Sequence, residues 1–526
     1  MRKWLIVLLC LLLIAVIAVW ITSVRLQPTV KARVERILSD RFDSAVTIGS
    51  IHVKLFPRAG MVAENITIRH HYRSDVPPII SIRKISANPD MASLLGANHD
   101  IQLVRLEGLQ IHIAAGTFKK KAPDEQKEQK NFTPAQAKDN TNHLPFVIRE
   151  IIADGTLLEI LPKKAGKEPL DFDIKKLTLR SVGVDRPMNF VAELTNAKPP
   201  GLIETQGRFG PWDKEDPGST PLSGHYTFDK ADLNVFKGIS GLLSSEGDYS
   251  GELDTIDAKG TTDTPDFSVD TSGKPVDLKT EFSATIDGTN GDTYLHPVIA
   301  HFRDSNFVCN GSVAGTPGVK GKTVYLDVVA DKARMEDLLY LAVKAKKPLL
   351  TGQMKFKSKL MIPPGDVEVI QKIILDGQFS LAAAHFTSDK VQGKIDTFST
   401  RAQGLKSNSD EAEEDVASHL SGKFILKNSL LRLNNFAFVI PGAQVSVNGT
   451  YGLRSEAVDM RGEVRLQATL SHMATGWKSL LLKPVDPFFK KDGAGALLHI
   501  TITGSRDDIH YGLDLHRKDT KNKKKK

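Results

Sequence analysis

The sequence predicts a mainly β protein, and three observations support this prediction. Between Val458 and Leu470, apolar and polar residues alternate in the pattern of strands with one buried face. From His143 to Gly404, short alternating segments are separated by Gly, Asp, Asn and Pro. A parallel α/β sheet is disfavoured, because its strands are buried on both faces and are separated by helices. We therefore expect an antiparallel sheet with one apolar and one polar face.

Alternation alone leaves open what the apolar face is for. In a sandwich or closed barrel this face fills a core, whereas in a long curled sheet it lines a groove for an apolar ligand. The pattern by itself favours the core, because alternation normally indicates nothing more than a half-buried strand. Hydrophobic residues make up 40% of the chain and the mean hydropathy is -0.20, which excludes a polytopic membrane protein.

The start of the chain predicts a transmembrane signal-anchor at residues 1–22. An apolar run extends from Trp4 to Ile21 behind two basic residues, close to the roughly 20 residues that span a bilayer. The positions assigned to the membrane are Trp4, Leu8, Leu12, Val16 and Trp20. A signal peptide cleaved after Ala18 is the alternative, but the apolar run continues past that site.

Residues 23–116 are expected to form a short amphipathic helix followed by strands. Pro28 can start the helix, which ends near Asp40 and places Val30, Val34, Ile37 and Leu38 on one face. Strands are expected over 46–55 and 62–68, with a turn at 57–60, and then over 79–85 and 101–113.

The rest of the chain divides by composition. Residues 117–142 are almost free of apolar side chains, which predicts a disordered linker and a domain boundary. A central β region then spans 143–404, with one helical candidate at 335–342. An acidic loop at 405–417 separates it from a C-terminal β region at 418–515, and a basic tail occupies 516–526.

The stretch "GTPGVKGKTVYLDVVAD" at 315–331 is the part of the chain most similar to a nucleotide-binding loop. A phosphate loop needs Gly, four residues and then Gly-Lys-Ser/Thr at the start of a helix. Here Thr316 stands where the first glycine is required, and an alternating strand pattern follows Lys322. We therefore expect a hairpin and no nucleotide site.

No motif for catalysis or metal binding is visible elsewhere. The histidines lack the spacing of a metal site, and there is no Gly-x-Ser-x-Gly nucleophile elbow. The two cysteines, Cys10 and Cys309, cannot form a disulfide framework, because Cys10 lies inside the apolar run. The sequence thus predicts no enzyme, no cofactor and no metal.

The net charge of +8 does not indicate a nucleic-acid partner. From Arg517 to Lys526 there are seven Lys or Arg against one Asp, so the tail contributes +6 and the remaining chain about +2. No basic patch with groove-reading motifs accompanies the rest of the chain. The tail is expected to be solvated, with contact to anionic lipid headgroups as the alternative.

Several stretches occur in a recognisable order. Near the start stand "VTIGSIHVKLFPRAGMVAENITI" and "VRLEGLQIHI"; near the end stand "GKFILKNSLLRLNNFAFVIPGAQVSVNGTYGL" and "GWKSLLLKPVDPFFKKDGAGALLHITITGS". Between them lie "DGTNGDTYLHPVIAHF" and "LDGQFSLAAAHFTSDKVQGKI". With its N-terminal apolar span, the chain resembles the AsmA-like proteins of the Gram-negative envelope. The resemblance covers most of the chain and rests on strand and turn signatures.

The resemblance implies an inner-membrane protein whose bulk lies in the periplasm. Its long antiparallel sheet would curl into a hydrophobic groove, similar to that of bridge-like lipid transfer proteins. The implied function is phospholipid transport in support of outer-membrane biogenesis, with phospholipids, the inner membrane and envelope proteins as partners. Nine residues are expected on the groove face: Val324, Leu326, Val328, Phe356, Leu360, Val464, Leu466, Ile500 and Ile502.

Two other functions remain as alternatives. An anchored envelope scaffold, or an outer-membrane protein assembly factor, would carry no lipid and would need an exposed binding surface. An enzyme of envelope lipid or glycan would need a convergent polar pocket, for which the sequence offers no residues.

Overall fold

The structure of the 526-residue chain is a computed structural model. It describes residues 28–54, 60–70, 76–87, 100–113, 147–403, 416–467 and 497–513, apart from short gaps within these ranges. The predicted anchor residues Trp4, Leu8, Leu12, Val16 and Trp20 lie outside them, as do the predicted linker, the basic tail and nearly all of the acidic loop. Among the described residues, no helix is long and apolar enough to cross a membrane.

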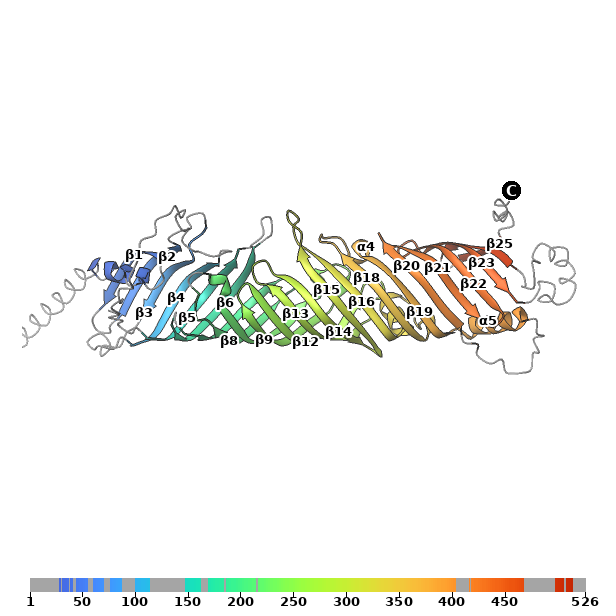
Figure 1. The fold of residues 1–526 in the computed structure, drawn as a ribbon, viewed down its shortest axis with the longest axis horizontal. Helices are drawn as coiled ribbons and strands as arrows, with labels where there is room; N and C mark the ends of the chain where they lie inside the picture. Colours follow the sequence, from blue (N-terminus) through green and yellow to red (C-terminus); the bar gives the residue numbers. More distant parts are fainter. Residues whose placement is uncertain are drawn as a thin grey trace, which may run out of the picture.

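One sheet of 25 strands dominates the described chain, and its strands follow one another in chain order along the long axis (Figure 1). The first half comprises β1 Ser44–Lys54, β2 Gly60–His70, β3 Ile80–Ala87, β4 Asp100–Ile113, β5 Val147–Ile160, β6 Leu170–Val182, β7 Met188–Ala197, β8 Pro200–Phe209, β9 Pro221–Asp232, β10 Ile239–Ser240, β11 Leu242–Glu252 and β12 Thr255–Val269. The second half comprises β13 Val276–Asp287, β14 Asp292–Phe302, β15 Ser305–Gly315, β16 Lys322–Arg334, β17 Leu350–Thr351, β18 Gln353–Ile362, β19 Ile374–Phe386, β20 Ser418–Lys427, β21 Leu430–Ile440, β22 Ala443–Gly452, β23 Ala457–Leu466, β24 Leu497–Ser505 and β25 Asp508–Leu513.

Short helices lie in the connections between the strands of this sheet. They are η1 Pro217–Ser219, η2 Leu233–Val235, α3 Met335–Ala342, α4 Val369–Lys372 and α5 Asp389–Ala402. The helix predicted at 335–342 is confirmed as α3. Helix α5 was not predicted, because Gly393, Thr397 and Thr400 are weak helix formers.

The mainly β prediction is confirmed, and the sheet is antiparallel with one exception. Strands β4 and β5 pair in parallel, with Val104 opposite Ile151 and Ile111 opposite Leu158. Parallel neighbours need a crossover of a dozen residues or more, and residues 114–146 between the two strands are long enough to make one. The segment predicted as a linker therefore falls where the sheet changes its pairing direction.

The hairpin predicted in place of a nucleotide loop is confirmed. Strands β15 and β16 are antiparallel neighbours, with Gly315 opposite Lys322. Lys322 opens strand β16, so no helix N-terminus follows the glycines. Its ammonium donates a hydrogen bond to the backbone oxygen of Asn290, at 2.9 Å.

Each strand runs from one long side of the sheet to the other. Helix α4 joins β18 to β19 on one side, whereas α3 follows β16 and α5 follows β19 on the other. Figure 1 shows α4 and α5 on opposite sides of the sheet. We call these the α4 side and the α5 side.

Residues at the predicted N-terminal helix cover the first strand edge. The chain is helical over most of 28–40, and Val34 and Leu38 pack against buried residues of the sheet. The Glu35 carboxylate accepts a hydrogen bond from the Ile48 N–H at 2.8 Å, and the Ser39 hydroxyl accepts one from the Val46 N–H at 3.1 Å. These bonds use backbone donors that would otherwise leave the edge of β1 able to pair with another strand.

Candidate functional site

The register of the second half of the sheet places apolar residues directly opposite one another over many strands. Leu326 on β16 faces Leu360 on β18, which faces Leu375 on β19. The complete row from β14 to β23 is Leu295, Gly311, Leu326, Leu360, Leu375, Leu426, Leu431, Tyr451 and Val458. It contains no charged residue. We call the face that carries this row the inner face.

The neighbouring row, on the opposite or outer face, is polar. Asp327 lies opposite Lys359, which lies opposite Asp376. These three side chains are exposed, whereas Leu326, Leu360 and Leu375 are half-buried. Because the side-chain period of a strand is two, this register gives the sheet one apolar and one charged face over many strands.

All nine residues predicted for the groove face lie on the inner face. Val328 and Ile502 belong to one row that passes through Ser358, Gly377, Phe424, Leu433, Gly449 and Met460. Val324 and Leu326 alternate in phase with Val328, as do Phe356 and Leu360 with Ser358. Val464, Leu466 and Ile500 occupy the same face of β23 and β24.

Burial separates these nine residues into two groups. Val464 and Leu466 are 7% and 4% exposed, and they belong to a buried cluster that contains Ala402 of α5. Ile395 and Phe398 of α5 pack against this cluster, as does Ile500. Val464 and Leu466 are thus packed beneath α5.

The residues of the second group are half-buried. Val328 and Phe356 pack against a second buried cluster, which includes Met354 and Leu381. Val324, Leu326, Leu360 and Ile502 are also half-buried, and they belong to none of the buried clusters formed by the described residues. These four residues are apolar, on one face and still accessible.

A ladder of phenylalanines crosses the same face, and sequence reasoning identified only Phe356 among them. Phe307 contacts Phe356 with ring centroids 6.2 Å apart, and Phe356 contacts Phe424 at 5.8 Å. Phe302 extends the ladder on one side, and Phe379 and Phe436 extend it on the other. The alternation phase of each strand could have indicated these rings, but their contacts depend on the register between strands distant in sequence.

Helix α3 is held beside this ladder by a buried carboxylate. Asp337 is 1% exposed and accepts hydrogen bonds from Arg303 Nε at 2.9 Å, the Asp304 N–H at 3.1 Å and Ser305 Oγ at 2.7 Å. Arg303 and Asp304 form the turn between β14 and β15, and Ser305 is the first residue of β15. Met335 of α3 is thereby fixed within the buried cluster that contains Phe302 and Phe307.

Between β8 and β13 the inner face carries hydroxyl groups among its apolar side chains, which include Phe228 and Phe282. They pair across strands: Thr205 with Tyr249 at 2.6 Å, Tyr226 with Ser245 at 3.0 Å, and Thr262 with Thr280 at 2.7 Å. Burial raises the pKa of Tyr226 and of Tyr249, with the hydroxyl partners opposing the shift. These hydroxyl pairs thus add polar but uncharged groups to this part of the inner face.

The inner face of the first strands is sealed. Ile48, Ile66 and Leu109 are 4%, 2% and 5% exposed within a buried cluster that spans β1 to β5. Val34 and Leu38 of the N-terminal helix pack against this cluster and cover it at that end of the sheet.

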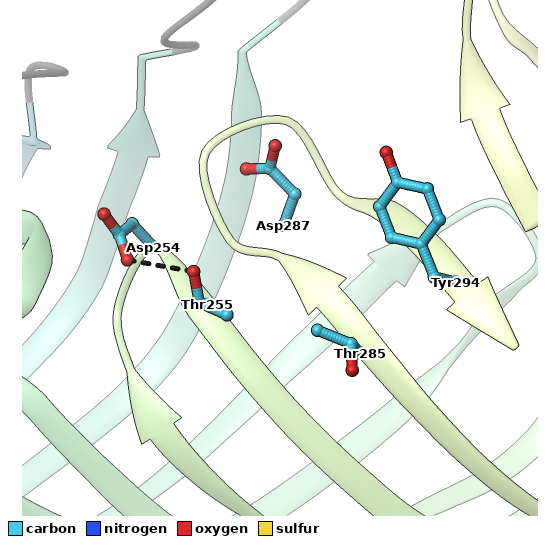
Figure 2. A pocket seen from close by; sticks show the side chains of 5 residues that line it. All are labelled: Asp254, Thr255, Thr285, Asp287 and Tyr294. Carbon is cyan, nitrogen blue, oxygen red and sulfur yellow. Dashed lines mark hydrogen bonds between the residues drawn. The ribbon is translucent and has the colours of Figure 1, made fainter. Parts of the chain in front are cut away.

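The outer face carries a small pocket with a volume of about 210 Å³. Figure 2 shows the five residues that line it: Asp254, Thr255, Thr285, Asp287 and Tyr294. Asp254 accepts a hydrogen bond from Thr255, and Asp287 accepts bonds from the loop residues Thr289 and Asn290. Both carboxylates thus accept hydrogen bonds from residues near them in the chain. The described residues contain no group of three or more His, Cys, Asp or Glu arranged to hold a metal ion.

Comparisons with protein-family models, with curated proteins and with solved structures found no match. The inner face is therefore the feature on which a functional proposal rests.

Proposed function

We propose that the inner face binds the acyl chains of phospholipids, and that the protein transfers lipid within the cell envelope without catalysis. The observation that carries the proposal is the uncharged row from Leu295 to Val458, whose members Leu326, Leu360 and Leu375 remain half-buried. An ordinary core would bury these leucines fully. Together with the resemblance to AsmA-like proteins, this supports an apolar groove anchored at the inner membrane through residues 1–22 and facing the periplasm.

The energetics of lipid transfer favour such a surface. A lipid that leaves a bilayer exposes its tails to water at a cost of about 0.8 kcal/mol per CH₂ group. A continuous apolar track lowers this cost at every step, while the headgroup stays in water. The nine strands that carry the row from Leu295 to Val458, spaced by about 4.8 Å, give a track on the order of 40 Å along the sheet.

Adjacent residues on β16 provide a matched test. Leu326 is half-buried on the inner face, whereas its neighbour Tyr325 is 50% exposed on the outer face. We expect Leu326→Glu to lower the phospholipid recovered with the purified full chain at least fivefold, because a carboxylate in an apolar track repels acyl chains. Tyr325→Glu should leave the recovered lipid unchanged.

Mass spectrometry of extracted lipid, normalised to protein and compared with an unrelated β protein, measures this difference. Circular dichroism confirms that both variants fold. Wild-type protein that is folded but free of lipid would contradict the proposal, as would equal lipid loss in the two variants.

One observation favours the alternative of an envelope scaffold. Ile299, Val308 and Val329 lie opposite one another on the outer face and are 44%, 39% and 37% exposed. A row of exposed apolar residues can serve as a protein contact. The scaffold function predicts that Val308→Asp abolishes capture of envelope proteins by the full chain, while Leu326→Glu has no effect on it. Lipid transfer predicts instead that Leu326→Glu lowers the lipid content and that Val308→Asp leaves it unchanged.

A further inference from the structure

Two contacts join parts of the sheet that lie on opposite sides. The register places Ile113 and Ile160 at the ends of β4 and β5 on the α5 side. It also places the loop between β9 and β11, residues 233–241, on the α5 side. Each of these regions contacts residues of the α4 side, so the sheet curls until its two sides meet.

The first contact is apolar and buried. Ile113 and Ile160 are both 3% exposed, and they share a cluster with Leu253, which is 6% exposed and lies in the turn between β11 and β12 on the α4 side. Phe209 and Trp212, also from the α4 side, pack against the same cluster. Separating this contact would expose all of these side chains to water, so burial of apolar surface favours the closed arrangement here.

The second contact is polar and short. Helix α4 reaches the 233–241 loop, where the Val369 N–H donates a hydrogen bond to the Lys237 carbonyl oxygen at 2.8 Å. Among the described residues, this is the one backbone hydrogen bond between the 233–241 loop and α4. No buried apolar cluster of the described residues includes residues from both the loop and α4. We call this contact the clasp.

The charges at the clasp act in opposite directions. Burial, followed by the charge of Lys198, lowers the pKa of Lys372, and Asp366 opposes this shift. Lys198 lies over the Phe236 ring on the α5 side, 5.6 Å from its centroid, while Lys372 belongs to α4. Hydrogen bonds with Gln371 and Arg454 lower the pKa of Glu368, and the charge of Lys237 across the clasp lowers it further. The repulsion between Lys198 and Lys372 thus opposes the attraction between Glu368 and Lys237, so the charges add little to the single hydrogen bond.

The clasp completes a ring around part of the inner face. Seven strands, β11 to β16 and β18, lie between the loop and α4. A closed sheet of about eight strands has an interior that side chains just fill or that holds one small ligand. Leu326 and Leu360 lie on the inner face of this ring and are only half-buried. An amphipath with two acyl chains can enter such a ring from the side only where the sheet separates.

We propose that the clasp is a lateral gate, at which the loop and α4 separate to admit a two-chain lipid to the inner face and then close behind it. The proposal rests on the proposed function and adds the place of entry. The apolar contact at Leu253 stays closed throughout.

A disulfide across the clasp tests the gate. A Cβ placed on Gly238 would lie 3.6 Å from the Val369 Cβ, within the range of about 3.5–4.5 Å that disulfides require. The double variant Gly238→Cys/Val369→Cys is made in a full chain with Cys10→Ala and Cys309→Ala. Gly238 has a φ of +101°, so a side chain there is strained. The reduced form of the same variant controls for this strain.

The readout is the initial rate at which the full chain takes up NBD-labelled phosphatidylethanolamine from phosphatidylglycerol-containing vesicles. We expect the oxidised variant to load at least tenfold more slowly than its reduced form, with full recovery after reductant is added. Equal rates in the two forms overturn the gate. Wild-type protein that takes up no probe overturns the proposed function itself, which separates the two failures.

A second pair of variants weakens the clasp instead of locking it. Val369 is the first residue of α4, where proline is tolerated, and Glu368 before it has φ -56° and ψ 143°, as a residue preceding proline requires. Val369→Pro therefore removes the N–H donor of the clasp and keeps the helix, whereas Val369→Ala keeps the donor. We expect uptake at least threefold faster in Val369→Pro than in Val369→Ala. Equal uptake by these two folded variants counts against the gate.

Discussion

The inner faces of β1–β5 and of β14–β23 arise from the same alternation, yet one is sealed and the other is half-open. In the first region, Ile66 is 2% exposed and lies in a cluster covered by the N-terminal helix. In the second region, Leu360 is half-buried and belongs to none of the buried clusters of the described residues. The comparison teaches that alternation defines a face, whereas the elements that cover it decide whether it is a core or a binding surface.

The largest effect is expected where a helix covers the second region. Leu466→Glu places a carboxylate in the buried cluster under α5, at a cost of several kcal/mol. We expect loss of the folded C-terminal end, detected as rapid hydrogen exchange in β22 and β23. Leu326→Glu on the half-open part should leave the exchange of β16 close to wild type. Equal damage in both variants would erase the distinction between the regions.

Truncation to alanine gives the same comparison at a smaller scale. Ile66→Ala should lower the free energy of unfolding by about 3 kcal/mol, because it leaves a cavity in a filled core. Leu360→Ala should cost only about 1 kcal/mol, since much of that side chain already contacts solvent. Urea unfolding followed by circular dichroism measures both values, with the exposed Lys359→Ala as the control on the outer face. A cost above 2 kcal/mol at Leu360 would indicate a sealed core.

The native thiol reports directly on the half-open face. Cys309 lies on the inner face opposite Val328, and burial raises the pKa of its thiol. A raised pKa leaves less thiolate at pH 8, so alkylation by iodoacetamide should be several-fold slower than at an exposed cysteine. Bound phospholipid should slow it further.

The matched control is Val308→Cys in a Cys309→Ala chain, because Val308 is 39% exposed on the outer face. Its alkylation should be fast and unaffected by lipid. Lipid protection of both positions, or of neither, would contradict the assignment of lipid to the inner face.

The smallest effect is expected at the first strand edge. Glu35→Ala leaves the Ile48 N–H without its carboxylate acceptor, which should cost about 1 kcal/mol. The uncovered edge should also raise self-association, measured by sedimentation velocity. Glu35→Gln keeps an acceptor oxygen and should remain close to wild type. Unchanged sedimentation of a folded Glu35→Ala chain would show that the helix covers the core without protecting the edge.

Much of the fold and part of the candidate site could be predicted from local pattern. The alternation around Val464 predicted its strand and its face, and the residues after Lys322 predicted a strand where a nucleotide loop needs a helix. Ile395, Phe398 and Ala402 have the spacing of a helical face, so a signal for α5 was present. It was obscured by weak helix formers, whose placement in a helix is favoured by packing on the sheet.

The sequence by itself determined which side chains share a face, because the period of a strand is local. Only the tertiary structure decided that Leu466 is covered and Leu326 is not, since cover comes from a helix more than sixty residues earlier in the chain. The same holds for the parallel pairing of β4 with β5 and for the contact of Lys237 with Val369. These features depend on how the sheet twists and curls. The twist accumulates over all the strands between the contacting residues, so a local sequence pattern does not contain it.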